Sequence, residues 1–191
     1  MTDNVSTITA GSYRFGLHHG PQYNVVVGEG LYEFGTGYPA AENHITDKTS
    51  DACVTCHMNV AYGTQAGGHT FNVAYDYHGS TVPNLPASCE ECHIPDGGMD
   101  LGDKMDALQT DITALLTELG TALETAGVKE VGANYIVHTS NPTVIAPQTE
   151  LMLAAFTNFQ AITEDRSLGM HNPAYIRVLL ANTISAVNAA K

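Results

Sequence analysis

Hydrophobic residues recur at helical spacing only in the second part of the chain. Residues 99–126 carry apolar side chains three and four positions apart, and Gly127 is a natural stop for that helix. Residues 148–164 are broadly apolar and predict a second helix, and a third begins after Asn172. Packed antiparallel, these three helices would bury their apolar faces against one another.

The last predicted helix has a well-defined start. In the stretch GMHNPAYIRVLL, Asn172 is a good N-cap and Pro173 takes the first helical position, where a missing N–H costs nothing. The apolar stripe of this helix consists of Ile176, Leu179, Leu180, Ile184 and Val187. His171 immediately precedes the cap, so a packed helix would hold this histidine in a fixed position.

The first part of the chain shows no sustained hydrophobic period. Residues 1–98 are rich in Gly, Tyr, His, Asn and Pro and cannot build much core from their own side chains. Residues 127–147 form a connection with Gly and Pro punctuation and one short extended piece at 135–137. We therefore predict a mainly α protein forming one compact domain, with a loop-rich region at 1–98 and a helical region at 99–191.

Acidic residues outnumber basic ones, 20 to 7, which gives a formal net charge of −13. That charge disfavours nucleic acids and anionic membranes as partners. No run of about eighteen apolar residues occurs, so we expect no membrane-spanning segment. The first ten residues, MTDNVSTITA, lack the basic start and apolar stretch of a signal peptide.

All four cysteines lie in two CxxCH motifs, CVTCH at 53–57 and CEECH at 89–93. A thioredoxin-like redox pair would need a βαβ unit, and none is visible. Zinc ribbons separate their CxxC pairs by roughly 15 to 20 residues, whereas 32 residues lie between these pairs. Zinc also gives no role to the following histidines. With 9 histidines in 191 residues, chance would place one after both pairs roughly once in 450 cases.

The chemistry that needs this spacing is covalent attachment of a c-type haem. Two thiols on one helical turn add to the two vinyl groups of a porphyrin, and the next residue presents its imidazole to the iron. We predict two covalently bound haem c groups, with His57 and His93 as proximal iron ligands. The thioether cysteines would be Cys53, Cys56, Cys89 and Cys92. Such macrocycles would fill the loop-rich region.

The sixth iron ligand decides between a reactive and an electron-carrying haem. The remaining histidines are His18, His19, His44, His69, His78, His138 and His171. Seven candidates for two places favour bis-histidine closure of both irons. His171 is the strongest by local structure, because it precedes a capped helix.

The other histidines differ in their surroundings. His44 lies nine residues before Cys53. His69 lies between the motifs, where Gly67 and Gly68 would let the backbone approach a flat ring and Phe71 would pack on its edge.

Four histidines are weaker candidates. His18 and His19, in the polar loop HHGPQ, could serve a haem or line its rim. We expect His78 and His138 to be surface residues.

The order of HHGPQ, ENH, CVTCHM, GGHTF, CEECH, a long helical segment and GMHNPAYIRVLL resembles the C-terminal region of multihaem c-type cytochromes related to the pentahaem ammonia-forming nitrite reductases. The likeness begins near residue 18 and covers most of the chain. It implies that the iron on His57 takes His171 and the iron on His93 takes His44. In the family, the histidine at the place of His69 reaches back to an earlier haem. His69 is therefore a third distal candidate: it replaces one of the two, remains unbound, or ligates a haem of a neighbouring chain.

The chain also departs from that family. The reductases carry a catalytic haem with lysine in place of the motif's histidine, and neither motif here is CxxCK. This departure from the family disfavours nitrite reduction. We expect an electron-transfer protein with low-potential haems rather than an enzyme, passing electrons to a redox partner or a like subunit along a chain of haems. Haem attachment normally follows export, so we expect a periplasmic or extracellular protein whose signal peptide is not present in this chain.

Two alternatives remain open. The first is a haem enzyme that reduces a small nitrogen oxide or peroxide at one open haem, with HHGPQ or Tyr75 and Tyr77 on its distal side. The second is a polymerising cytochrome subunit of an extracellular conductive filament, joined through surplus histidines. Spectra with added ligands would test the first alternative, and sizing in solution would test the second.

Overall fold

The computed structural model describes residues 4–5, 19–39, 51, 53–84, 89, 93, 101–140 and 145–191. The described part is mainly α-helical, as predicted. Its contacts divide the chain into two compact units, one comprising Met1–Ala41 with Gln109–Lys191 and the other Glu42–Leu108. The N-terminal segment thus clusters with the helices and not with the cysteine motifs. No helix in the described ranges is long and apolar enough to cross a membrane.

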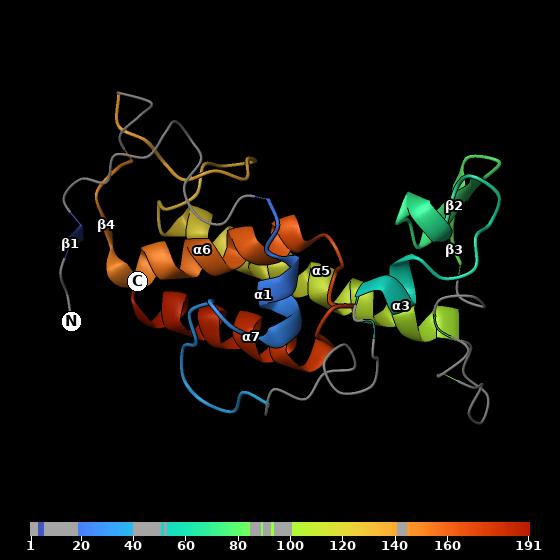
Figure 1. Cartoon of the computed structure of the whole chain (residues 1–191). Coiled ribbons are helices and arrows are strands. Elements are labelled where there is room, and N and C mark those ends of the chain that lie inside the picture. Colours follow the sequence, from blue (N-terminus) through green and yellow to red (C-terminus); the bar gives the residue numbers. More distant parts are fainter. Residues whose placement is uncertain are drawn as a thin grey trace. The chain divides into compact units, whose positions relative to one another are not determined.

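The first unit contains most of the helical structure (Figure 1). Its elements are β1 (Asn4–Val5), α1 (Gln22–Val27), α5 (Leu101–Thr125, of which the part from Gln109 belongs to this unit), β4 (Gln148–Thr149), α6 (Glu150–Asp165) and α7 (Pro173–Ala189). Strands β1 and β4 pair antiparallel. The three long helices lie within one or two residues of the predicted ones, because their apolar periods are long and regular.

The helix ends follow the local chemistry of the sequence. Asn172 caps α7 by accepting a hydrogen bond from the Tyr175 N–H at 3.3 Å, with proline at the first helical position. Thr149 caps α6 in the same way through the Met152 N–H at 3.2 Å. After α5 the chain turns at Gly127, whose φ of +71° suits glycine. These observations confirm the predicted cap at Asn172 and the predicted stop at Gly127.

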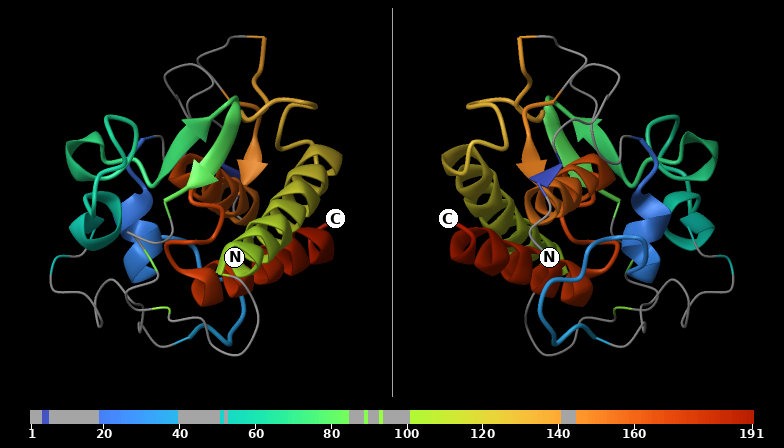
Figure 2. Two further views of the ribbon diagram at one scale, coloured as in Figure 1. Left: turned by 90° about the vertical axis from the view of Figure 1, so that its right-hand side faces the viewer. Right: turned by 90° about the vertical axis from the view of Figure 1, so that its left-hand side faces the viewer.

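Helices α6 and α7 run antiparallel and pack directly on each other (Figure 1). The predicted stripe of α7 is buried along its whole length, and Phe156 and Ile162 of α6 are fully buried with it. Each such side chain stabilises the fold by about 1.5–3 kcal/mol relative to an exposed one. Helix α5 crosses α7 (Figure 2). Arg177 Nε of α7 donates to Asp111 Oδ2 of α5 at 2.5 Å.

Asparagine side chains of α6, of α7 and of the α7 N-cap form hydrogen bonds with the backbone of residues 19–39. Asn158 is fully buried; its Oδ1 accepts from the Tyr32 N–H at 2.9 Å and its Nδ2 donates to the Tyr32 carbonyl at 2.7 Å. Asn172 Nδ2 donates to the Val26 carbonyl at 3.0 Å, and Asn182 Nδ2 donates to a carbonyl of the same segment at 3.0 Å. These bonds satisfy backbone groups that no regular element pairs.

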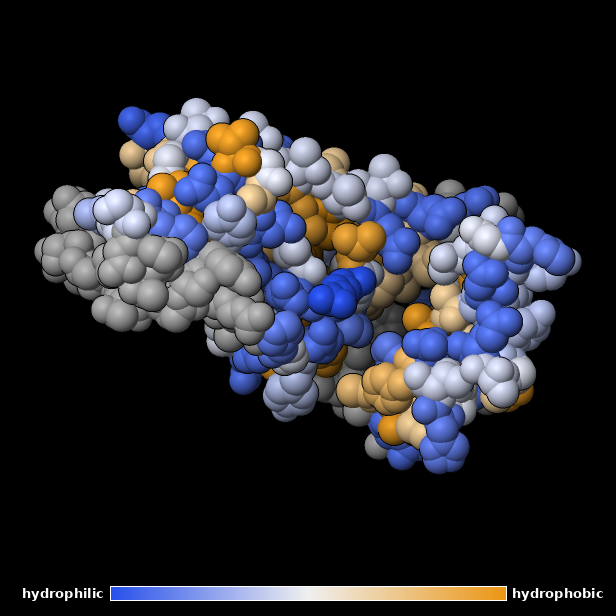
Figure 3. Space-filling model, turned by 90° about the horizontal axis from the view of Figure 1, so that it is seen from above, coloured by the Kyte–Doolittle hydropathy of each residue, from blue (hydrophilic) through white to orange (hydrophobic). Residues whose placement is uncertain are grey.

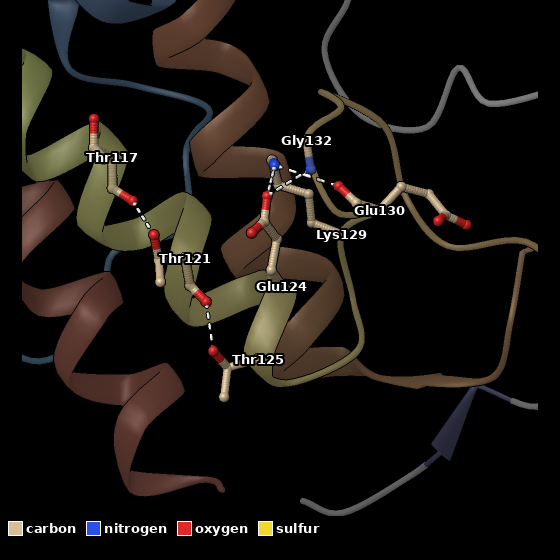
Figure 4. A network of polar contacts seen from close by, with 7 residues as sticks. All are labelled: Thr117, Thr121, Glu124, Thr125, Lys129, Glu130 and Gly132. Atoms are coloured by element: carbon tan, nitrogen blue, oxygen red, sulfur yellow. Dashed lines mark hydrogen bonds and ion pairs between the residues drawn. The ribbon is translucent and has the colours of Figure 1, made fainter.

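The connection after α5 is held by a polar network (Figure 4). Lys129 is buried; its Nζ lies 2.6 Å from Glu124 Oε1, which also accepts from the Gly132 N–H at 3.1 Å. The pairing of residue 129 with Ile136 confirms the predicted extended piece. His138 is only partly exposed and its Nε2 is buried, so the prediction that it is a surface residue was wrong. Pairing of its backbone with Ile145 draws it inward.

The second unit contains α3 (Cys53–His57), the 3-10 turn η1 (Gly68–Thr70) and a hairpin of β2 (Ala74–Tyr77) and β3 (Ser80–Pro83). The hairpin was not predicted, because its strands are short and carry no clean alternation. Among the described residues of this unit only Ala66, Gly67 and Asn84 are buried. The second unit therefore has almost no apolar core of its own in its described part.

Candidate haem-binding site

The first CxxCH motif forms a single helical turn, α3. The turn is extended at both ends by backbone bonds, from the Val54 N–H to the Asp51 carbonyl at 3.0 Å and from the Met58 N–H to the Val54 carbonyl at 2.9 Å. Cys53 is exposed and Cys56 is half-buried, and neither is in a disulfide. Residues three apart on a helix share a face, so the two thiols lie on one side of the turn.

His57, the last residue of α3, has a defined hydrogen bond at one ring nitrogen. Its Nδ1 lies 2.9 Å from the Phe71 carbonyl oxygen. A carbonyl can only accept, so Nδ1 carries the proton and Nε2 carries the lone pair that binds metals. The Phe71 ring also stacks on the imidazole, with centroids 4.5 Å apart and an interplanar angle of 15°.

Two glycines bring Phe71 to this position. Gly67 has φ +68° and ψ −177°, a conformation open essentially to glycine alone. A Cβ there would lie 2.5 Å from the Val60 carbonyl oxygen, and the Gly68 N–H donates to the Asn59 carbonyl at 2.8 Å. The glycines therefore pack the turn onto the chain that follows α3. On its Cβ side Gly67 meets protein backbone, and the expected approach of Gly67 and Gly68 to a flat ring stays a prediction.

The structure describes two residues of the second motif, Cys89 and His93. The His93 N–H donates to the Cys89 carbonyl at 2.9 Å, which is the bond from residue i to i−4 of an α-helix. Cys89 is half-buried and His93 is exposed. Cys92 lies outside the described residues.

His171 is held by a buried carboxylate. Its Nδ1 lies 2.6 Å from Asp165 Oδ1; the histidine side chain is 17% exposed and the aspartate side chain is 0% exposed. Ser167 Oγ donates to the other oxygen of Asp165 and accepts from the His171 N–H at 3.3 Å. His171 was predicted from the sequence but Asp165 was not, because a contact six residues away across a loop leaves no periodic signal.

The remaining candidates fall in different places. His69 is exposed on η1, and His19 is also exposed. His78 is exposed, as predicted, with its ring edge-on to Tyr77 at 4.5 Å. His18 and His44 lie outside the described residues. The residues that the structure brings together are Cys53, Cys56, His57 and Phe71 in one unit, and Asp165, Ser167 and His171 in the other.

Hydrophobic side chains are exposed around the first motif. Val54 is 46% exposed, Val60 71%, Phe71 48% and Val73 40%. On the face drawn in Figure 3, hydrophobic residues likewise reach the surface among hydrophilic ones. The second unit therefore offers apolar surface that a bound apolar group would cover.

The donor set around the first motif suits covalent haem. Within the described residues, no three or more His, Cys, Asp or Glu side chains gather as a metal cluster. A CxxCH motif needs none, because one turn supplies two thiols and a single iron ligand. The turn of α3, its two thiols and the lone pair of His57 Nε2 meet that requirement.

Comparison with protein-family models, curated proteins and solved structures finds no match for this chain. The resemblance to multihaem cytochromes thus rests on the motifs themselves, in their order along the chain.

Proposed function

We propose that this protein is a dihaem c-type cytochrome that transfers electrons. The observation that carries the proposal is the first motif, in which both thiols lie on one helical turn and the Phe71 carbonyl fixes the proton of His57 on Nδ1. Carbonyl or carboxylate partners at the second ring nitrogen are what metal-bound histidines almost always have. The helical bond from His93 to Cys89 supports the same role for the second motif.

The chain's residues would divide the work of holding two haem c groups. Cys53 and Cys56 would form the thioether bonds of the first, and Cys89 and Cys92 those of the second. His57 and His93 would be the proximal iron ligands. The resemblance assigns His171 and His44 as distal ligands, with His69 as the third candidate. When bound, haem iron supplies a one-electron redox couple.

Two imidazole ligands on each iron would give low reduction potentials, because neither iron would have a methionine sulfur ligand, which raises the potential. The exposed apolar side chains Val54, Val60 and Val73 would exclude water from the macrocycle edge. The net charge of −13 favours a redox partner with a basic docking surface. We propose an exported protein, periplasmic or extracellular, that exchanges electrons with that partner or with a like subunit.

The exposure of His69 supports the alternative of a polymerising cytochrome subunit. His69 is exposed on η1 rather than buried near α3, so it is placed on the surface where a second copy could reach it. For the enzyme alternative, Tyr75, one candidate for the distal side of an open haem, stacks on Tyr62 with ring centroids 3.8 Å apart.

The experiment is a pyridine haemochrome assay on the exported protein and on two double variants. Wild type should carry two covalent haems per chain, and Cys53→Ala with Cys56→Ala should carry one. Cys89→Ala with Cys92→Ala is the matched variant and should also carry one. Absence of covalent haem in the wild-type protein would refute the proposal. So would an unchanged haem content in both double variants.

A further inference from the structure

We propose that Asp165 is a positioning residue that holds His171 as an iron ligand and strengthens its donation to the metal. The inference rests on the proposed function, because it assigns a role toward one of the proposed haems. Nothing in the sequence motifs points to Asp165. The geometry around His171 does.

The contact is short and protected from water. Asp165 Oδ1 lies 2.6 Å from His171 Nδ1, and the carboxylate side chain is 0% exposed. A buried carboxylate is costly unless hydrogen bonds satisfy it. Here the imidazole satisfies one oxygen, and the Ser167 hydroxyl donates to the other. The carboxylate therefore makes its contact with the imidazole inside the protein, away from solvent.

The consequence for the imidazole follows from its two nitrogens. A carboxylate at Nδ1 keeps the proton on that nitrogen and leaves the lone pair on Nε2. It also fixes the orientation of the ring, and in metal sites a carboxylate partner at this nitrogen strengthens the donation of the imidazole to the metal. The neutral Phe71 carbonyl at His57 also keeps the proton on Nδ1, but it carries less negative charge than a carboxylate. His171 would therefore be the stronger donor of the two.

The backbone between the two residues is held in an uncommon conformation. Arg166 has φ +61° and Leu168 has φ +48°, both in the left-handed region that side chains other than glycine rarely adopt. Such strain persists only where surrounding contacts fix it, and it gathers at functional sites. Ser167, between the two strained residues, bonds both Asp165 and the His171 N–H. The loop therefore adopts a strained backbone conformation that keeps the carboxylate of Asp165 next to the imidazole of His171.

The alternative reading is a structural ion pair that only closes the loop before α7. The two readings differ in what a neutral amide would do. Replacement by asparagine keeps the shape of Asp165 but removes its charge. If the pair only closes the loop, stability changes and the ligand properties of His171 do not.

The test compares Asp165→Asn with Glu164→Gln in the haem-loaded protein. Glu164 is the neighbouring carboxylate; it pairs with Arg166 at 3.5 Å and is not the residue that contacts His171. Both substitutions remove one negative charge from the same helix end. Ser167→Ala is a milder third variant, which keeps the carboxylate in case Asp165→Asn folds poorly.

We expect Asp165→Asn to raise the reduction potential of one haem and leave the other unchanged in a spectroelectrochemical titration. Cyanide should displace the weakened ligand with about 10- to 100-fold higher apparent affinity, the range typical of lost outer-shell partners. Ser167→Ala should change both in the same direction but less. Glu164→Gln should change neither.

Equal potentials and cyanide affinities in wild type, Asp165→Asn and Ser167→Ala, with both haems low-spin, would overturn the inference and leave the proposed function intact. Two six-coordinate low-spin haems in His171→Ala would overturn it as well, since His171 would then not be a ligand. Absence of covalent haem in wild type would instead defeat the proposed function itself.

Discussion

The partner of Nδ1 decides which nitrogen of a histidine is left to bind a metal. His57 and His171 both have an oxygen at Nδ1, a carbonyl in one case and a buried carboxylate in the other. Sequence motifs identified both histidines but neither oxygen. Phe71 and Asp165 reach them through turns with left-handed backbone, which no hydrophobic period encodes.

At the residue scale, His57→Ala tests the proximal assignment. The thiols of α3 would still attach haem, but one iron would lose its strong ligand, so about half of the low-spin signal should become high-spin. Electron paramagnetic resonance of the oxidised protein measures the change. His78→Ala is the control, because His78 is exposed and has no assigned role. An unchanged low-spin spectrum in His57→Ala would contradict the assignment.

Elements with long, regular patterns were predictable, and those built on distant contacts were not. Helices α5, α6 and α7 matched the periodicity, and the caps of α7 and α5 matched Asn172 and Gly127. The fastening of residues 19–39 was missed, because Asn158 and Asn172 reach backbone groups 126 and 146 positions away. An amide side chain carries no sequence signal of such a distant partner.

At the element scale, the end of α5 predicts a pH dependence. The Lys129 ammonium and the Gly132 N–H lower the pKa of Glu124 below its ordinary 4.5. A lowered folded-state pKa stabilises the fold above the ordinary value, and that stabilisation is lost as the pH falls through the lowered pKa. Glu124→Gln should therefore lower the melting temperature at pH 7, and its difference from wild type should shrink below about pH 4.5.

Thermal unfolding followed by circular dichroism across pH 3 to 8 measures this effect. Glu118→Gln, a substitution at an exposed position of the same helix, is the control and should leave the melting temperature near that of wild type. A Glu124→Gln deficit that stays constant down to low pH would show that the carboxylate charge is not responsible.

At the scale of the whole molecule, the two units differ in how they are filled. The unit with α6 and α7 buries a continuous set of Leu, Ile, Val and Phe side chains. In the described part of the unit with the cysteine motifs, Ala66 is the one buried hydrophobic residue. The sequence already indicated this contrast through the missing period of residues 1–98. The clustering of residues 1–41 with the helices could not be read from composition.

We propose that the second unit holds two haems and that each haem iron has two protein ligands. Low-temperature electron paramagnetic resonance of the fully loaded, oxidised protein tests it most directly, with haem content measured on the same sample. We expect two low-spin ferric haems per chain and no change in the reduced optical spectrum on adding carbon monoxide. A high-spin haem that binds carbon monoxide, or a chain purified without covalent haem, would contradict it.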